Sequence, residues 1–192
     1  MVLVVIDGLD ASGKSTHAHS LSSFLKQHGC TVFLRIHPSS DSCFGIKAKQ
    51  FLYVKGKSAH FLAAFFYMLD VVRSILLYSW RQYDYVIFVR YLMGTAYLPP
   101  PLCRIAYHFF ALIVPTSRFM FFLDAKPEEA YRRIESTRKR LEMFESLAEL
   151  KQIRRRALSL AQMDNWTIID TNKPIAEVEA EIRKLLSGGR DL

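Results

Sequence analysis

Cysteine is scarce in this chain, and the few cysteines lack the spacing of a metal site. Among 192 residues there are three, Cys30, Cys43 and Cys103, which is an odd number. Zinc sites and disulfide frameworks use closely spaced or paired cysteines. The pattern therefore indicates neither of them, and a reducing, cytoplasmic location is expected.

Long uninterrupted hydrophobic runs are absent as well. The first apolar run, Val2 to Ile6, is shorter than the core of a signal peptide and has no basic flank. Charged residues interrupt the two longer apolar stretches, residues 59–80 and 102–123. The interrupting charges are Asp70 and Arg73 in the first stretch and Arg104 and Arg118 in the second. Since a membrane-spanning helix needs about 20 consecutive apolar residues, we expect neither a signal peptide nor a membrane-spanning segment.

Acidic residues are outnumbered by basic ones. The chain has 18 aspartates and glutamates against 26 lysines and arginines, a formal net charge of +8. A nucleic-acid binder, a site for several phosphates and a solvated basic surface all fit this balance. The sequence contains no known nucleic-acid recognition module, so nucleic acid is not expected as a partner.

Apolar residues are more abundant than a small soluble domain needs. Hydrophobic residues make up 51% of the chain and aromatic residues 13%. Such a surplus predicts an apolar surface buried between subunits. The length suits one domain, and no repeat, low-complexity segment or boundary divides residues 1–192. A single domain is therefore expected.

A glycine-rich segment near the amino terminus carries the most specific pattern. Residues 8–15 match G-x-x-x-x-G-K-[ST], between the first apolar run and a helix-like stretch. In such a loop successive backbone N–H groups point at phosphates, and the positive end of the next helix lies beneath them. Lys14 adds a charge near the β and γ phosphates, and the Ser15 hydroxyl ligates Mg²⁺. The motif predicts a nucleotide-binding loop made of Gly8, Leu9, Asp10, Ala11, Ser12, Gly13, Lys14, Ser15 and Thr16.

The rest of the chain alternates between short strand-like runs and longer helical patterns. The expected strands are residues 2–6, 31–36, 85–89, 118–123 and 166–170, and the expected helices are residues 14–28, 44–54, 58–80, 102–113, from 127 onward, and 175–186. Strands that alternate with helices form a parallel sheet with right-handed crossovers. The predicted fold class is α/β, with a five-stranded parallel sheet flanked by helices.

Together these segments resemble the nucleoside monophosphate kinases, and within them the thymidylate kinases. The segments that carry the resemblance are Ile6–Asp10, Lys14–Thr16, Leu34-Arg35 with Pro38, Phe66, Arg90-Tyr91 with Ala96-Tyr97, Phe122–Glu129, and Ile169-Asp170. Their common order and spacing, over nearly the whole chain, is more specific than any one of them. The resemblance implies a P-loop NTPase fold and ATP-dependent phosphoryl transfer to a nucleoside monophosphate. It also implies ATP and Mg²⁺ as cofactors, and a homodimer.

The resemblance implies roles for individual residues around the acceptor nucleotide. Asp10 would hold the sugar 3′-hydroxyl, and Arg90 would hold the acceptor phosphate during the transfer. Arg35 and Tyr97 would belong to the same acceptor site.

A short basic lid is implied at about residues 132–145. Arg138 and Arg140 of this lid would stabilise the transfer, since phosphoryl transfer spreads negative charge over oxygens. The arginines that follow the lid, Arg154 to Arg156, are expected on a solvated helix face.

One position departs from the family pattern at the end of the third expected strand. Val89 stands where the family has the aspartate of Asp-Arg-Tyr, which helps to hold Mg²⁺. In one interpretation Asp7, at the end of the first strand, takes over this metal-binding and catalytic role. In the other, the chain is a nucleotide-binding protein with weak or lost kinase activity.

The base-binding positions depart from the family as well. The family stacks the base on a phenylalanine and has a donor arginine four residues later. Phe66 with Asp70, or one residue later Tyr67 with Val71, occupies these positions, so the arginine is missing in either register. In the first register Asp70 would face the base, accept hydrogen bonds and disfavour thymine, unless Arg73 compensates. The acceptor stays open, and a kinase of another small acceptor is an alternative.

Overall fold

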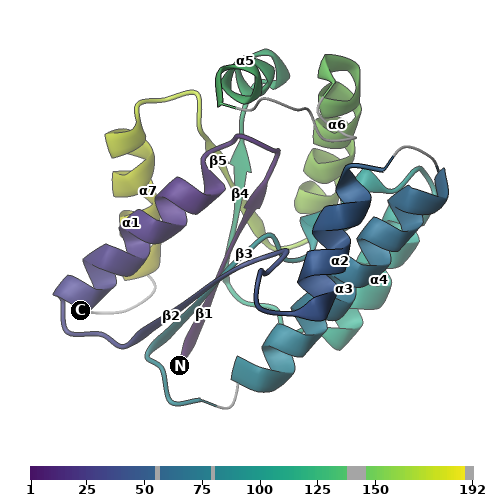
Figure 1. Ribbon diagram of the computed structural model, residues 1–192. Coiled ribbons are helices and arrows are strands. Elements are labelled where there is room, and N and C mark those ends of the chain that lie inside the picture. Colours follow the sequence, from purple (N-terminus) through teal and green to yellow (C-terminus); the bar gives the residue numbers. More distant parts are fainter. Residues whose placement is uncertain (55–56, 79–80, 138–145, 189–192) are drawn as a thin grey trace.

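The computed structural model describes residues 1–54, 57–78, 81–137 and 146–188 (Figure 1). Its centre is one sheet of five strands, β1 (Val2–Gly8), β2 (Val32–Ile36), β3 (Tyr85–Val89), β4 (Phe119–Asp124) and β5 (Trp166–Asp170). The strands lie in the order β2-β3-β1-β4-β5, and every neighbouring pair is parallel. The predicted α/β fold with a five-stranded parallel sheet is therefore confirmed.

Helices cover both faces of this sheet, which explains why the central strands are apolar throughout. The helices are α1 (Lys14–Gln27), α2 (Cys43–Leu52), α3 (Lys57–Tyr78), α4 (Leu102–Ile113), α5 (Pro127–Thr137), α6 (Leu147–Met163) and α7 (Ile175–Ser187). α1 and α7 pack together on one face, while α2, α3, α4, α5 and α6 pack on the other (Figure 1). The two faces form two separate apolar clusters, so β1, β3 and β4 are buried from both sides.

Most element bounds agree with the sequence-based prediction to within one or two residues. Two elements were not predicted: a short 3₁₀ helix η1 (Met93–Tyr97) that follows β3, and the helix α6. The expected lid begins within α5, which ends at Thr137, and its residues 138–145, with Arg138 and Arg140, lie outside the described residues.

Within the described ranges one helix, α3, is long and apolar enough to cross a membrane, over Phe61–Tyr78. One side of α3 packs on α2 and the sheet, and its Asp70 and Ser74 are fully buried there. Its other side leaves large apolar side chains exposed, among them Phe65 and Leu76. α4 also leaves large apolar side chains exposed.

Candidate functional site

The glycine-rich loop connects the end of β1 to the start of α1, and its backbone requires glycine. Gly8 and Gly13 have φ angles of 148° and 87°, which L side chains rarely adopt. A Cβ on Gly8 would also overlap the carbonyl oxygen of Leu123 on β4. Ala11 adopts a φ of 57° between them. This succession of positive φ angles turns the chain sharply, so that α1 begins beside the carboxyl end of the sheet.

Lys14 is folded into the loop. Its side chain is only 4% exposed, and its Nζ donates to the carbonyl oxygens of Gly8 at 3.0 Å and Leu9 at 2.5 Å. Ser15 and Thr16, in the first turn of α1, are exposed at the same place. The loop therefore presents an ammonium group, two hydroxyls and the positive end of a helix together, a combination suited to bind phosphate groups.

Asp7 lies directly beneath the loop and is 2% exposed. Its Oδ2 accepts hydrogen bonds from the backbone N–H groups of Tyr91 (2.7 Å) and Met93 (3.0 Å), and its Oδ1 accepts one from Gly8 (3.0 Å). Burial raises the pKa of this carboxyl, although the three amides and Lys14 oppose the rise. Asp7 thus connects the end of β1 to the segment that follows Arg90.

Asp10, Arg90 and Tyr97 form a polar cluster beside the loop. Oδ1 of Asp10 accepts from the Arg90 guanidinium at 2.5 Å, and Oδ2 accepts from the Tyr97 hydroxyl at 2.7 Å. Burial would raise the pKa of Asp10, but Arg90 and Lys14, helped by the Tyr97 hydroxyl, hold this pKa well below its usual range. The cluster therefore keeps a carboxylate and a guanidinium charged at the edge of the phosphate loop.

Arg90 reaches this cluster because the backbone turns where β3 ends. Its φ of 60° is unusual for a residue other than glycine. Its backbone N–H donates to the Ile6 carbonyl oxygen (3.1 Å), and its carbonyl oxygen lies 3.1 Å from Nδ1 of His37. Together with the Asp7 bond to Tyr91, these contacts fix the backbone on both sides of Arg90.

A cavity of about 350 Å³ opens next to the cluster, where the strands have their carboxyl ends. This is where open α/β sheets bind their ligands. One end is polar and contains Asp7, Asp10, Arg90 and Tyr97. The other end lies between α2 and α3 and is mostly apolar. Its lining side chains are Ile36, Pro38, Ala48, Leu52, Tyr53, Ala63, Ala64, Tyr67 and Leu98, with Lys49 as the charged exception.

His37 also lines the cavity and was not singled out in the sequence. Its ring is fully buried, and its Nε2 has no hydrogen-bond partner among the described residues. Burial lowers the pKa of His37 to about 4. The ring is therefore neutral at pH 7, and with Nδ1–H donating to Arg90 the Nε2 atom is an acceptor. In the sequence, the only signal for His37 as a cavity residue is its position between the end of a strand and Pro38.

The base-binding prediction for Phe66 and Asp70 is wrong. Neither residue lines the cavity. Phe66 stacks on Phe51 of α2, with ring centroids 5.7 Å apart, and Asp70 is bonded to the chain between β2 and α2. The other register has Tyr67 lining the cavity and Val71 fully buried in the core.

Two expected acceptor arginines are also placed elsewhere. Arg35 donates to both oxygens of Asp41, at 2.8 and 2.7 Å, and to the Ser74 hydroxyl. Arg73 is not among the cavity residues, and its buried NH1 has no hydrogen-bond partner in the described part of the chain. Neither arginine therefore lies at the acceptor end of the cavity, where Arg73 was expected to compensate for the missing donor.

Val89 is fully buried and packs in the apolar cluster beneath α1 and α7. It pairs with Ile6 on β1 and Ile36 on β2. β3 therefore ends without an acidic side chain, whereas β1 has Asp7 near its carboxyl end. Within the described residues no three His, Cys, Asp or Glu side chains gather in a metal-binding group.

Three further arginines have structural contacts that the sequence did not indicate. Arg133 of α5 donates to the Ala11 carbonyl oxygen of the phosphate loop at 3.2 Å. Arg154 pairs with Asp124 at the end of β4, at 2.6 and 2.7 Å, and Arg156 donates to the Leu98 carbonyl oxygen at 3.1 Å. The expectation of a solvated face is therefore wrong for Arg154 and Arg156.

Comparison with known proteins gives a consistent result. A family model described as thymidylate kinase matches residues 6–182. The probable thymidylate kinase of Metallosphaera sedula is 29% identical, over 98% of this chain and 93% of that protein. The probable thymidylate kinase of Archaeoglobus fulgidus is 27% identical, over 96% of this chain and 94% of that protein.

Among solved structures, a thymidylate kinase from Candida albicans has a similar fold. The TM-score is 0.74, and the alignment covers 98% of this chain and 92% of that chain. At 20% sequence identity this similarity concerns the fold alone.

Proposed function

This chain belongs to the thymidylate kinase family, and we propose that its acceptor nucleotide binds in the cavity between the phosphate loop, α2 and α3. The protein is a nucleoside monophosphate kinase, which transfers a phosphoryl group from ATP to a nucleoside monophosphate. The observation that supports the location is the Asp10–Arg90–Tyr97 cluster, which lies between the phosphate loop and the cavity.

The donor side of the reaction is the phosphate loop. ATP would place its phosphates against the loop amides and the start of α1, where Lys14 exchanges its bonds to Gly8 and Leu9 for bonds to phosphate oxygens. No covalent intermediate is required, because phosphoryl transfer depends on alignment of the two nucleotides and on stabilisation of negative charge.

The donor groups present fit a Mg²⁺ ion that is held mainly by phosphate oxygens. Ser15 is exposed in the first turn of α1 and would supply its hydroxyl. The three amide donors to Asp7 leave a lone pair on its Oδ1, so Asp7 would contribute through a bound water. When bound, Mg²⁺ supplies charge neutralisation at the phosphates and usually keeps several waters.

The acceptor side is built around Arg90. A monophosphate that enters the cavity would take the Arg90 guanidinium as its partner, and the sugar hydroxyl would reach Asp10. The Asp10–Arg90 ion pair holds both groups in place before the nucleotide arrives, which reduces the ordering cost of binding.

The base end of the cavity supports weak discrimination between bases. Among the described residues, the lining contains no arginine, asparagine or glutamine side chain to read a base edge, apart from Arg90 at the polar end. Packing against Tyr67, Leu52 and the alanines is available to any base. We expect several monophosphates to serve as acceptors.

The test is an assay of ADP release with a panel of nucleoside monophosphates. Wild-type protein should release ADP only when a monophosphate is present, with kcat/KM values for several bases within about 200-fold of each other, as packing alone discriminates by only about 1–3 kcal/mol. Lys14→Ala should abolish release with every acceptor. Equal ADP release with and without each monophosphate would contradict the proposal.

A nucleotide-binding protein with weak activity is the second candidate, favoured by Val89. This chain lacks the carboxylate that the family has at the end of β3, and Asp7 is committed to three amides. ATP binding by calorimetry, together with no transfer to any acceptor, would favour this candidate.

The exposed apolar surface on α3 and α4 supports a homodimer. Phe65, Leu76, Ile105, Phe109 and Leu112 are all more than half exposed, and Leu112 is 87% exposed. α3 and α4 both pack on the same face of the sheet (Figure 1), and exposed apolar side chains on both helices favour burial of this face in an interface. A second copy of this chain is the proposed partner.

The absence of a disulfide among three free cysteines fits a cytoplasmic location.

A further inference from the structure

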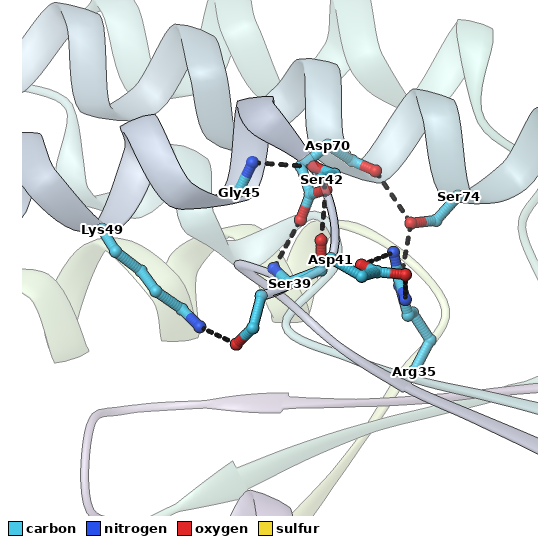
Figure 2. Close-up of polar contacts among 9 residues, drawn as sticks. Arg35, Ser39, Asp41, Ser42, Gly45, Lys49, Asp70 and Ser74 are labelled. Atoms are coloured by element: carbon cyan, nitrogen blue, oxygen red, sulfur yellow. Dashed lines mark hydrogen bonds and ion pairs between the residues drawn. The ribbon is translucent and has the colours of Figure 1, made fainter.

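Asp70 is fully buried on α3, and among the described residues every hydrogen bond to its carboxylate comes from one short loop. This loop, residues 38–42, connects β2 to α2. Oδ2 of Asp70 accepts from the Ser39 N–H at 2.6 Å (Figure 2). Oδ1 accepts from the Ser39 hydroxyl at 2.7 Å and from the Ser42 hydroxyl at 2.5 Å. No lysine, arginine or histidine in the described residues donates to this carboxylate.

A buried carboxylate is costly unless hydrogen bonds satisfy it. Because the loop supplies all of these bonds, any shift of the loop away from α3 leaves Asp70 unsatisfied. The hydrogen bonds to Asp70 also help to hold the first turn of α2. The Ser42 hydroxyl that donates to Asp70 also accepts from the Gly45 N–H at 2.9 Å, as the N-cap of α2. A Cβ on Gly45 would overlap the backbone of Ser39, so helix and loop are in backbone contact.

A second set of contacts holds the same loop from the sheet side. Arg35 at the end of β2 binds Asp41 through two hydrogen bonds and donates to the Ser74 hydroxyl at 3.2 Å. Ser74 in turn donates to the Asp70 carbonyl oxygen at 2.9 Å. Figure 2 shows these side chains converging on the loop from β2 and α3. The residues expected to bind substrate, Arg35 and Asp70, are instead the supports of this loop.

The loop and α2 form one wall of the cavity. Pro38 precedes Ser39, and Ala48, Lys49 and Leu52 project from α2 into the lining. The opposite wall is α3, with Ala63 and Tyr67, on the same helix as Asp70. The Asp70 carboxylate thus determines how far apart the two walls of the acceptor end lie.

We propose that Asp70 is a positioning residue for acceptor binding, which acts by holding the loop 38–42 and α2 against α3. It touches no substrate. The claim rests on the proposed acceptor site. Loss of Asp70 should weaken acceptor binding and leave ATP binding unchanged, since the phosphate loop and α1 make no part of this network.

The chain offers a control carboxylate with the same kinds of hydrogen-bond donor, at an exposed rather than a buried position. Asp84, before β3, accepts from the N–H and the hydroxyl of Thr31 at 2.8 and 2.7 Å, as Asp70 does from Ser39. Asp84 lies at the amino end of the sheet, opposite the cavity. Asp84→Leu removes the same kinds of hydrogen bond and should lower stability by less, because water can replace an exposed carboxylate, and it should leave acceptor binding unchanged.

The kinetic experiment compares Asp70→Leu, Asp70→Asn and Asp84→Leu. With Asp70→Leu the KM for the acceptor should rise about tenfold or more, because three donors lose their acceptor, while the KM for ATP stays within about twofold. Asp70→Asn should largely restore the acceptor KM, since its carbonyl accepts from the Ser39 N–H and both hydroxyls can rotate to accept from its NH₂. If Asp70→Leu fails to fold, Ser42→Ala should shift the acceptor KM in the same direction by less.

Hydrogen exchange of the α2 amides gives a measurement that needs no turnover. Exchange in Cys43–Leu52 should be faster in Asp70→Leu than in Asp84→Leu, so the positioning claim is tested even if no monophosphate proves to be an acceptor. Equal α2 exchange in these two variants would overturn the claim, as would equal changes in the KM values for acceptor and ATP.

Discussion

The Arg90 guanidinium and the Asp10 carboxylate meet at 2.5 Å across 80 residues of sequence. Arg90 comes from the end of β3 and Asp10 from the phosphate loop, so the ion pair connects the donor and acceptor sides of the site. Both groups are largely withdrawn from water, and a hydrogen bond to a charged group is then worth more than a neutral one. The contribution of this ion pair to acceptor binding can therefore be measured by substitution.

Asp10→Asn should weaken acceptor binding. It removes the charge that holds Arg90, and a lost charge-assisted hydrogen bond costs about 1.5–3 kcal/mol, which corresponds to a rise of about tenfold to a hundredfold in acceptor KM. Tyr97→Phe, which removes only the second donor to Asp10, should have a smaller effect. Steady-state kinetics with each substrate varied in turn gives both values. A rise in the KM for ATP alone would place Asp10 on the donor side.

Val89→Asp should increase phosphoryl transfer if a missing metal anchor limits the rate. Metal anchors commonly contribute about one to two factors of ten, so kcat at saturating Mg²⁺ should rise by about that amount. Val89 is fully buried among apolar side chains, so Val89→Asn is the control for the cost of a polar group there. An unchanged kcat in Val89→Asp, with the fold intact by circular dichroism, would mean that a carboxylate at this position is not limiting.

His37 should make the protein less stable as the pH falls. Burial lowers its folded pKa to about 4, from an ordinary value of 6.5. The unfolded chain therefore binds a proton between these values that the folded chain does not. Stability contributed by His37 is complete above pH 6.5 and is lost towards pH 4, by up to about 1.4 kcal/mol per pH unit.

His37→Asn tests this pH dependence, because its side-chain amide can replace Nδ1–H as the donor to Arg90. Urea unfolding between pH 7 and pH 4.5 should show a shallower loss of stability in the variant than in the wild type. His17 also has a lowered pKa, but it contributes equally to both proteins and cancels in the comparison. Identical slopes would mean that His37 does not titrate in this range.

Leu112→Glu should convert a dimer to a monomer without unfolding it. Leu112 is 87% exposed on α4, so a charge there costs nothing in the isolated chain but disrupts an apolar interface. Ile175→Glu, at a 59% exposed position on α7 on the opposite side of the sheet, is the control. Sedimentation velocity should give twice the chain mass of 22.2 kDa for the wild type and the control, and 22.2 kDa for Leu112→Glu. A monomeric wild type would contradict the proposed dimer.

The sequence predicted those parts of the fold and site that local chemistry determines. The phosphate loop was predictable because glycines, Lys14 and Ser15 must lie at fixed spacing between a strand and a helix. The central strands β1, β3 and β4 were predictable because strands buried on both faces read as continuous apolar runs, and β2 because it is rich in β-branched and aromatic residues. Tertiary contacts decide the rest. Phe66 and Asp70 do share a face of α3, as their spacing predicts, but this face is turned towards α2.

The error over Asp70 has a physical cause. Its partners Ser39 and Ser42 lie about 30 residues earlier in the chain, and serines next to a proline read only as a turn. Their spacing does not show that they donate hydrogen bonds to a carboxylate on a helix that follows much later in the chain. The same holds for Arg133, whose bond to Ala11 spans 122 residues.

The two carboxylates of Asp84 and Asp70 also bear on how this protein behaves at high concentration. β2 is an edge strand of the sheet, and an edge strand that frays can pair with a strand from another molecule and start aggregation. Asp84 holds the chain just before β2, at Thr31, and Asp70 holds it just after, at Ser39. Because β2 is held at both ends, we expect it to stay in register with β3 and this edge to be less prone to aggregation.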